Sequence, residues 1–302
     1  MEKHSILDLI KEARPEIRAS TLKSYYYGIR RAMPEKSVKR LGVGMSENRV
    51  SMAWMSNFKD VLSRLEAVPY TVAVTKTTLT PLLVISKHLF GGDSDTYAGY
   101  LAESERLGDI LCKEQMAHEK TATMEKNWIE LDELRTFVLA MPTATAKQKI
   151  RRLIGALYVL HPPARNDYSS MQLIDSDEDI DDTTNYLVLK DGVPDHFLFQ
   201  SYKTSKKYGL VTVPIGVELR TELESFLGER KTGLLFGKKM NKSAVSYAMS
   251  QAFAPLGKHV TVNTLRHIVT TDSIDLDTRL QQKKLAEAMM HSSDQQLCYA
   301  KK

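Results

Sequence analysis

Five polar side chains in the second half of the chain have the types needed to cut a phosphodiester without a metal ion. In chain order they are Arg165, Lys203, Arg266, His291 and Tyr299. Two arginines can neutralise phosphate oxygens through forked hydrogen bonds. A lysine can protonate a departing sugar oxygen, and a phenolic oxygen can be the nucleophile. The set therefore predicts attack by a tyrosine on a backbone phosphate.

Each of the three cations and the histidine lies in a distinct local sequence. The segments are His-Pro-Pro-Ala-Arg-Asn-Asp-Tyr around Arg165, Ser-Tyr-Lys-Thr-Ser-Lys-Lys-Tyr-Gly around Lys203, Asn-Thr-Leu-Arg-His-Ile-Val-Thr-Thr around Arg266 and Met-His-Ser-Ser around His291. The double proline before Arg165 interrupts a helix, which places this arginine just after a helix boundary. Lys206 and Lys207 are alternatives to Lys203 as the proton donor.

The second part of the chain predicts a mainly α fold with one small antiparallel β-sheet. Three β-rich runs at 186–189, 196–199 and 210–213 are separated by turn residues, and we expect them to form a three-stranded sheet. Lys203 then lies in the connection between the last two strands. Helical patterns surround the sheet; the expected helices span 132–139, 146–160, 217–227, 242–253, 263–274 and 279–290.

The first part of the chain predicts helices only. Apolar residues recur there at three- and four-residue steps. The expected helices are one capped by Ser20 or Thr21, one containing Phe58 and Leu65, one from about Thr77 to Gly91 with Pro81 in its first turns, and one beginning near Asp95. Residues 113–127 are polar and are predicted to be a linker, part of which can extend the preceding helix. The predicted domains are therefore a helical domain at 1–112 and a mixed domain of helices and one small sheet at 128–302.

Positive charge is concentrated near the start of the chain. The whole chain carries a formal net charge of +5, and residues 17–49 hold eight basic and two acidic residues. Contact with a phosphate backbone is one interpretation, and a solvated helix face is the other. The expected DNA-binding residues are Arg18, Lys23, Arg30, Arg31, Lys39 and Arg40, together with Lys206 and Lys207. The acidic stretch 175–182 is predicted to be a solvated turn.

Several classes of protein are disfavoured by what the sequence lacks. Cys112 and Cys298 give neither a disulfide framework nor metal-ligand spacing. The first residues do not resemble a signal peptide, and the longest apolar runs are too short to cross a bilayer. No phosphate-cradling Gly-Lys-Ser/Thr loop is present. We therefore expect an intracellular protein that is not secreted, with no membrane contact, no metal and no cofactor.

These motifs, in this order, resemble those of the tyrosine recombinase (phage-integrase) family. The segment around Lys203 resembles the family's catalytic-lysine hairpin, the segment around Arg266 its His-x-x-Arg box, and Met-His-Ser-Ser followed by Tyr299 its closing motif. The helical first part is similar to the core-binding domain, which forms a clamp around duplex DNA with the catalytic domain. The segment around Arg165 is similar to integrases of large DNA viruses and related mobile elements.

The resemblance implies a site-specific recombinase or integrase that cuts and rejoins duplex DNA through a 3′-phosphotyrosyl intermediate, without metal or ATP. It implies double-stranded DNA as partner, a homotetramer on two DNA sites and no small-molecule substrate. Viral genome integration is one biological setting that it suggests. Arg165 and Arg266 would stabilise charge on the phosphate, His291 would donate to a phosphate oxygen, Lys203 would protonate the leaving 5′-oxygen and Tyr299 would attack.

Two features depart from the family pattern. Asn263 stands where the family usually has histidine, three residues before Arg266, and an amide can donate to phosphate but cannot accept a proton from tyrosine. Asn263 as a helix cap is the other interpretation. The spacing from His291 to Tyr299 is one residue shorter than usual. Asp167 is a further candidate, as a residue that orients Arg165 or a neighbour.

Three alternative functions remain open. A type IB topoisomerase would use the same chemistry on one duplex. A DNA-binding protein of the same fold with weakened catalysis would account for Asn263. A helical interaction module without nucleic acid would make the basic segment and all five site residues coincidental.

Overall fold

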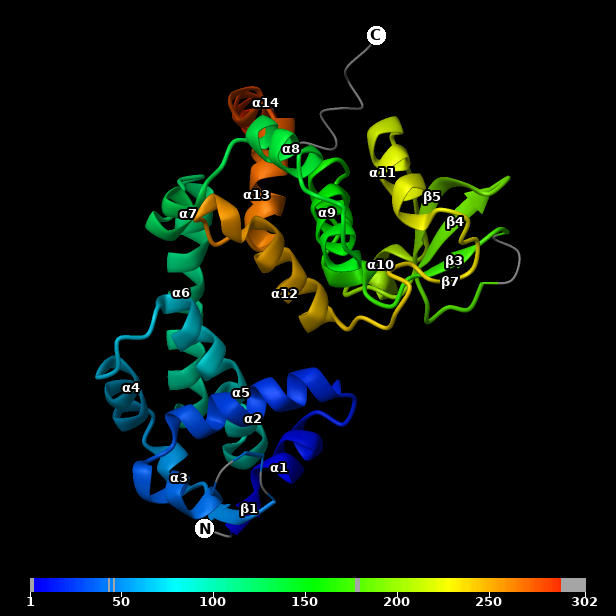
Figure 1. Ribbon diagram of the computed structural model, residues 1–302. Coiled ribbons are helices and arrows are strands. Elements are labelled where there is room, and N and C mark those ends of the chain that lie inside the picture. The colour runs from blue at the N-terminus through cyan, green and yellow to red at the C-terminus, as the bar shows by residue number, and fades with distance from the viewer. Residues whose placement is uncertain (1–2, 43, 46, 177–179, 289–302) are drawn as a thin grey trace. The chain divides into compact units, whose positions relative to one another are not determined.

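The computed structural model of the chain describes residues 3–42, 44, 45, 47–176 and 180–288. In this part the chain is mainly helical and contains two small sheets (Figure 1). The Cα positions separate into two compact units, Met1–Glu119 and Lys120–Lys302. No helix among the described residues has the length and apolar character needed to cross a membrane.

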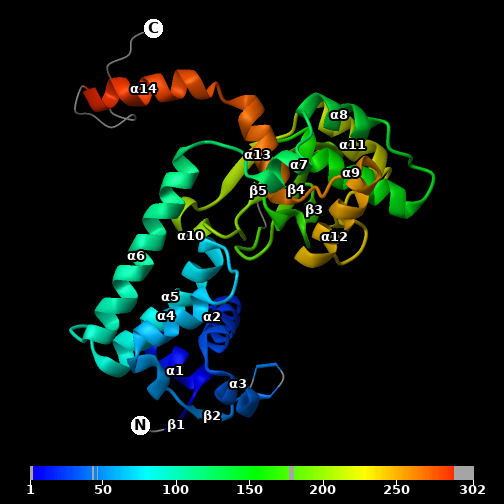
Figure 2. The same ribbon diagram turned by 90° about the vertical axis from the view of Figure 1, so that its left-hand side faces the viewer.

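The first unit is a group of helices around one apolar core, with a short two-stranded sheet. Its elements are β1 Lys3–Ser5, α1 Ile6–Ala13, α2 Ala19–Ala32, α3 Glu35–Leu41, β2 Arg49–Ser51, α4 Phe58–Glu66, α5 Val72–Phe90 and α6 Asp95–Met116. The long helices α5 and α6 pack along each other, and α2 packs on α5 (Figure 2). The expectation of helices only is wrong, because β1 pairs antiparallel with β2. Strands of three residues are too short to show an alternating pattern.

Two helix starts in the first unit differ from the prediction. Helix α2 begins at Ala19, so Ser20 and Thr21 lie inside it and neither is its cap. Helix α5 begins after Thr71, whose side chain accepts a hydrogen bond from the Val74 amide, and Pro81 therefore lies in the middle of the helix rather than in its first turns. A run of valine and threonine precedes Pro81, and these residues give a weak helix signal.

The residues predicted as a linker are largely helical. Helix α6 extends to Met116, and a short helix, α7 Ala122–Asn127, follows within the second unit. Two hydrogen bonds join the end of α7 to a later loop: Lys258 Nζ donates to the Lys126 carbonyl at 2.8 Å, and the His259 amide donates to Asn127 Oδ1 at 2.7 Å. Residues 122–127 are thus fixed to the second unit, which the polar composition of this stretch does not reveal.

The second unit is built around one central helix. Its helices are α8 Leu131–Leu139, α9 Ala146–Val159, α10 Ser205–Tyr208, α11 Val217–Leu227, α12 Lys242–Phe253, α13 Val262–Ser273 and α14 Leu276–Ala288. Helix α9 contacts α8, α11, α12 and α13. It begins with a capping box between Thr145 and Gln148, and every residue from Leu153 to Val159 is buried. This buried end leads directly into the segment that carries Arg165.

The sheet of the second unit has five strands and is mixed. The strands are β3 Gln172–Ile174, β4 Tyr186–Lys190, β5 Val193–Phe199, β6 Val211–Pro214 and β7 Gly233–Leu234, in the order β6-β5-β4-β3-β7. The three predicted strands are β4, β5 and β6, and they pair antiparallel as expected. The prediction of a wholly antiparallel three-stranded sheet is nevertheless wrong, because β3 lies parallel to β4 and β7 pairs with β3.

The acidic stretch 175–182 is described only in part, since residues 177–179 lie outside the described residues. In the remainder, Asp181 Oδ2 accepts a hydrogen bond from the Tyr186 hydroxyl at 2.7 Å, and Asp181 Oδ1 accepts one from the Thr183 amide. Hydrogen bonds from Thr183, and then from Tyr186, lower the pKa of the Asp181 carboxyl below its usual range. This end of the acidic stretch is therefore attached to the start of β4.

Candidate functional site

Two arginines that are far apart in the sequence line one cavity. Arg165 follows the double proline after α9, and Arg266 lies in the second turn of α13. The cavity has a volume of about 530 Å³. Arg266 Nη1 donates a hydrogen bond to the Pro163 carbonyl at 2.7 Å, which ties α13 to the proline segment. The rest of the wall is mostly apolar and includes Phe199, Val211, Val213, Val269 and Ile274.

A buried tyrosine fixes the backbone of Arg165. The Tyr158 hydroxyl, from the last turn of α9, donates to the Arg165 carbonyl at 2.6 Å. The Tyr158 ring packs edge-on against Tyr168, with ring centroids 5.4 Å apart. Burial raises the pKa of Tyr158 above its usual value, so its hydroxyl stays a proton donor. The Arg165 side chain is exposed and makes no hydrogen bond or ion pair with any residue that the structure describes.

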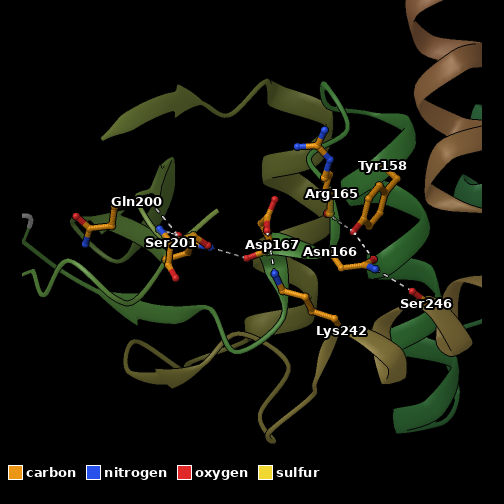
Figure 3. A network of polar contacts seen from close by, with 9 residues as sticks. Tyr158, Arg165, Asn166, Asp167, Gln200, Ser201, Lys242 and Ser246 are labelled. Atoms are coloured by element: carbon orange, nitrogen blue, oxygen red, sulfur yellow. Dashed lines mark hydrogen bonds and ion pairs between the residues drawn. The ribbon is translucent and has the colours of Figure 1, made fainter. Parts of the chain in front are cut away.

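Asn185 joins the Arg165 turn to the end of strand β5. Its side-chain amide nitrogen donates to the Asp167 carbonyl at 2.9 Å and to the Ser201 carbonyl at 3.2 Å. Its side-chain oxygen accepts from the backbone amides of Gln200 at 3.0 Å and Ser201 at 2.8 Å. Figure 3 shows Gln200 and Ser201 on one side of these contacts and Asp167 on the other. One buried amide therefore sets the position of the arginine turn relative to the segment that leads to Lys203.

Helix α12 holds the other side of the same turn. Asn166 Nδ2 donates to Ser246 Oγ at 2.9 Å, and Lys242 Nζ lies 3.6 Å from Asp167 Oδ1 (Figure 3). Asp167 is buried, and Lys242 places an opposite charge beside its carboxylate. The role of Asp167 in orienting Arg165 or a neighbour stays a prediction.

Lys203 lies close to the cavity in sequence but does not line it. The connection from β5 to β6 contains the short helix α10, and its ends are joined by a hydrogen bond of 2.8 Å from the Tyr202 hydroxyl to the Gly209 carbonyl. Tyr202 lines the arginine cavity, whereas Lys203, Lys206 and Lys207 are exposed and are not among the residues that line it. Lys207 Nζ lies 5.0 Å from the centre of the Tyr208 ring.

Asn263 is neither a helix cap nor part of the arginine cavity. Helix α13 is capped by Thr261, which forms a capping box with Thr264, and this corrects the interpretation of Asn263 as the cap. Asn263 is exposed and lines a separate hollow of about 480 Å³ together with Asn166 and Tyr247. His291, Cys298 and Tyr299 lie outside the described residues, and the roles assigned to the first and last of them stay predictions.

His161 is a residue of the arginine cavity that the sequence did not single out. It is buried, and its ring lies over Phe197 with centroids 5.2 Å apart. Neither ring nitrogen has a hydrogen-bond partner among the described residues. Burial lowers the pKa of His161 to about 4, so the imidazole is neutral at pH 7. A buried polar ring without partners costs stability.

Replacing His161 with phenylalanine is expected to stabilise the protein and to flatten its pH dependence. The folded pKa of about 4 lies below the ordinary 6.5, so the stability of wild type is complete above pH 6.5 and falls as the pH drops towards 4. The loss by pH 4 is on the order of 3 kcal/mol. Urea unfolding of both proteins at several pH values measures the difference. Equal pH dependence in wild type and His161→Phe would show that the imidazole is not held neutral.

The basic segment of the first unit is partly occupied by internal contacts. Arg30 Nη1 donates to the Gly44 carbonyl at 2.8 Å, Arg31 Nη1 donates to Thr78 Oγ1 at 2.7 Å, and Lys39 pairs with Glu35 at 2.7 Å. The side chains of Arg18, Lys23 and Arg40 are exposed. Tyr25 and Tyr26 are buried, so two of the three neighbouring tyrosines pack inside the unit. Arg18, Lys23 and Arg40, whose side chains form no hydrogen bond or ion pair with a described residue, are the better candidates for contact with a phosphate backbone.

Comparisons of the chain with protein-family models, with curated proteins and with solved structures find no match. Among the described residues no group of three or more histidine, cysteine, aspartate or glutamate side chains could hold a metal ion.

Proposed function

We propose that the chain is a tyrosine-type site-specific DNA recombinase, which cuts and rejoins duplex DNA through a covalent 3′-phosphotyrosyl intermediate. The observation that carries the proposal is the pair Arg165 and Arg266 in one cavity. Arg165 has a guanidinium free of contacts with the described residues, and Arg266 uses one nitrogen on Pro163 and keeps other donors for a ligand. Two guanidinium groups in one hollow suit the oxygens of a phosphate.

In the proposed reaction, Tyr299 attacks the phosphorus atom and its phenolic proton passes to water. The bond from phosphorus to the 5′-oxygen breaks, and Lys203 gives that oxygen a proton. The products are a 3′-phosphotyrosine and a free 5′-hydroxyl, and attack by the 5′-hydroxyl of a partner duplex reverses the chemistry on the new strand. Charge on the non-bridging oxygens grows as the bond to tyrosine forms, and the two arginines stabilise it.

The proposed reaction requires Lys203 to act at the cavity that its neighbour Tyr202 lines. The hydrogen bond from the Tyr202 hydroxyl to the Gly209 carbonyl joins the two ends of the connection that carries Lys203. His291 and Tyr299 lie outside the described residues, and their part in the reaction is proposed from the sequence. In the proposed enzyme the first unit corresponds to the core-binding domain and the second to the catalytic domain, acting as a tetramer on two duplexes.

Wild-type protein is expected to form an SDS-resistant adduct with a nicked duplex that loses a short strand after cleavage. The released strand cannot attack again, so the covalent intermediate accumulates, and peptide mapping is expected to find the nucleotide on Tyr299. Two labelled duplexes distinguish recombination from a type IB topoisomerase, since a topoisomerase rejoins the original strand. The complete absence of adduct over a library of duplex sequences would contradict the proposal.

A DNA-binding protein of this fold with weakened catalysis is a second candidate. The position of Asn263 favours it, because this residue replaces the usual histidine and faces a hollow separate from the arginine cavity. This candidate predicts duplex binding that weakens steeply with salt, as for any clamp on phosphates, but no covalent adduct.

A further inference from the structure

A second hollow of the second unit combines positive charge with an apolar floor. It lies between α9 and α12 and has a volume of about 530 Å³. Its cations are Lys147, Arg151, Lys238 and Lys239, and its floor is formed by Ile150, Met240, Ala244 and Ala248. Among the described residues that line it there is no carboxylate. The hollow therefore suits a ligand that is negatively charged in one part and apolar in another.

Tyr247 forms an exposed aromatic wall of this hollow. Its side chain is 64% exposed, although it lies on a helix whose neighbouring residues Val245 and Met249 are fully buried. Arg151 Nη2 donates to Gln251 Oε1 at 3.2 Å, which holds the guanidinium beside α12. An exposed ring beside cations can stack on a flat partner while the cations bind an anion.

This combination fits an unpaired nucleotide better than a duplex. In a duplex the base faces are stacked on one another, and the phosphates alone would gain nothing from an apolar floor. An unpaired base offers a free face for stacking on an aromatic side chain, and its phosphates remain available to lysines. The volume of the hollow also lies in the range typical of small-ligand sites.

We propose that this hollow binds an unpaired nucleotide of a DNA strand, with the base against Tyr247 and its phosphates on the surrounding lysines. The inference rests on the proposed function, because strand cleavage and exchange separate bases near the cut. The hollow would be a binding site for a single strand, and none of the described residues assigned to cleavage lines it.

The position of Tyr247 connects this hollow to the arginine turn. Tyr247 also lines the neighbouring hollow that contains Asn166 and Asn263. The adjacent residue Ser246 accepts the hydrogen bond from Asn166, which directly follows Arg165 in the chain. A strand bound along α12 therefore runs towards the turn that carries Arg165.

The test compares binding of a short fluorescent oligothymidine with binding of an abasic strand of equal length and of a duplex, by anisotropy at one salt concentration. Tyr247→Ala is expected to weaken oligothymidine binding about tenfold or more, because one base loses its stacking partner. Binding of the abasic strand and of the duplex is expected to stay unchanged. Tyr247→Phe keeps the ring and is expected to bind like wild type.

Tyr208→Ala is the matched control, since Tyr208 is also an exposed tyrosine of the second unit (59%) but lies outside the hollow. The inference is overturned if Tyr247→Ala leaves oligothymidine binding unchanged, or weakens the abasic strand and the duplex equally. Covalent adduct formation by wild type is scored separately. If wild type forms the adduct but Tyr247→Ala binds oligothymidine like wild type, only this inference is refuted. If oligothymidine binding depends on Tyr247 but wild type forms no adduct, only the proposed recombinase is refuted.

Discussion

Replacing Tyr299 with phenylalanine is expected to abolish the SDS-resistant DNA adduct completely. The substitution removes the single oxygen atom that would attack phosphorus and leaves a ring of nearly the same size. Two described tyrosines close to the arginines are not free to take over. The buried hydroxyl of Tyr158 donates to the Arg165 carbonyl and burial raises its pKa, and the hydroxyl of Tyr202 donates to the Gly209 carbonyl. Gel separation of labelled suicide substrate after SDS treatment measures the adduct, and it is expected only with wild type.

Binding of duplex DNA should be the same for Tyr299→Phe and wild type, because one phenolic oxygen adds little to a clamp held by phosphate contacts. Tyr208→Phe serves as a matched control, since it removes an exposed hydroxyl from the same unit and should keep full adduct formation. Equal adduct from Tyr299→Phe and wild type would assign the nucleophile to another residue and refute the proposed mechanism.

The sequence predicted the helices and strands in which the spacing of apolar residues within the element itself indicates the structure. Helix α9 lies where the three- and four-residue spacing places it, and β4 and β5 contain the predicted runs 186–189 and 196–199, although β5 begins three residues earlier, at Val193. Strands β3 and β7 were missed because they have three and two residues and exist through pairing with neighbours. The interior position of Pro81 also depends on packing, since Gly28 of α2 leaves room for its ring: an added Cβ there would come within 2.9 Å of Pro81 Cγ.

The types and order of the residues predicted the two arginines of the candidate site, but not the residues whose hydrogen bonds hold them in place. A guanidinium after a double proline and another in a helix after Leu265 are visible as motifs. The role of Asn185 is not visible, because its four hydrogen bonds join segments from three parts of the chain. The cap of α13 shows the same limit, since Thr261 and Asn263 both have side chains that can cap and only Thr261 has Thr264 three residues on.

Replacing Arg165 with alanine is expected to lower the single-turnover cleavage rate about 10²–10³-fold, the usual effect of losing one charge-stabilising donor. The Arg165 side chain is exposed and forms no hydrogen bond or ion pair with the described residues, so the urea midpoint should not change. Arg165→Lys keeps the positive charge but cannot donate the two parallel hydrogen bonds of a guanidinium. Its cleavage rate should therefore lie between those of Arg165→Ala and wild type. Cleavage rates on the suicide substrate and urea unfolding curves provide both measurements.

Arg266→Ala should lose at least as much rate and should also lose stability. Its guanidinium donates to the Pro163 carbonyl at 2.7 Å, and hydrogen bonds from charged groups contribute about 1.5–3 kcal/mol. This bond also holds the segment that positions Arg165, so the double variant should lose much less than the product of the two single effects. A pair of arginines that act on one phosphate through a shared turn predicts such non-additivity. Two independent surface arginines would leave cleavage near the wild-type rate in each single variant, and that result would remove the basis of the proposed site.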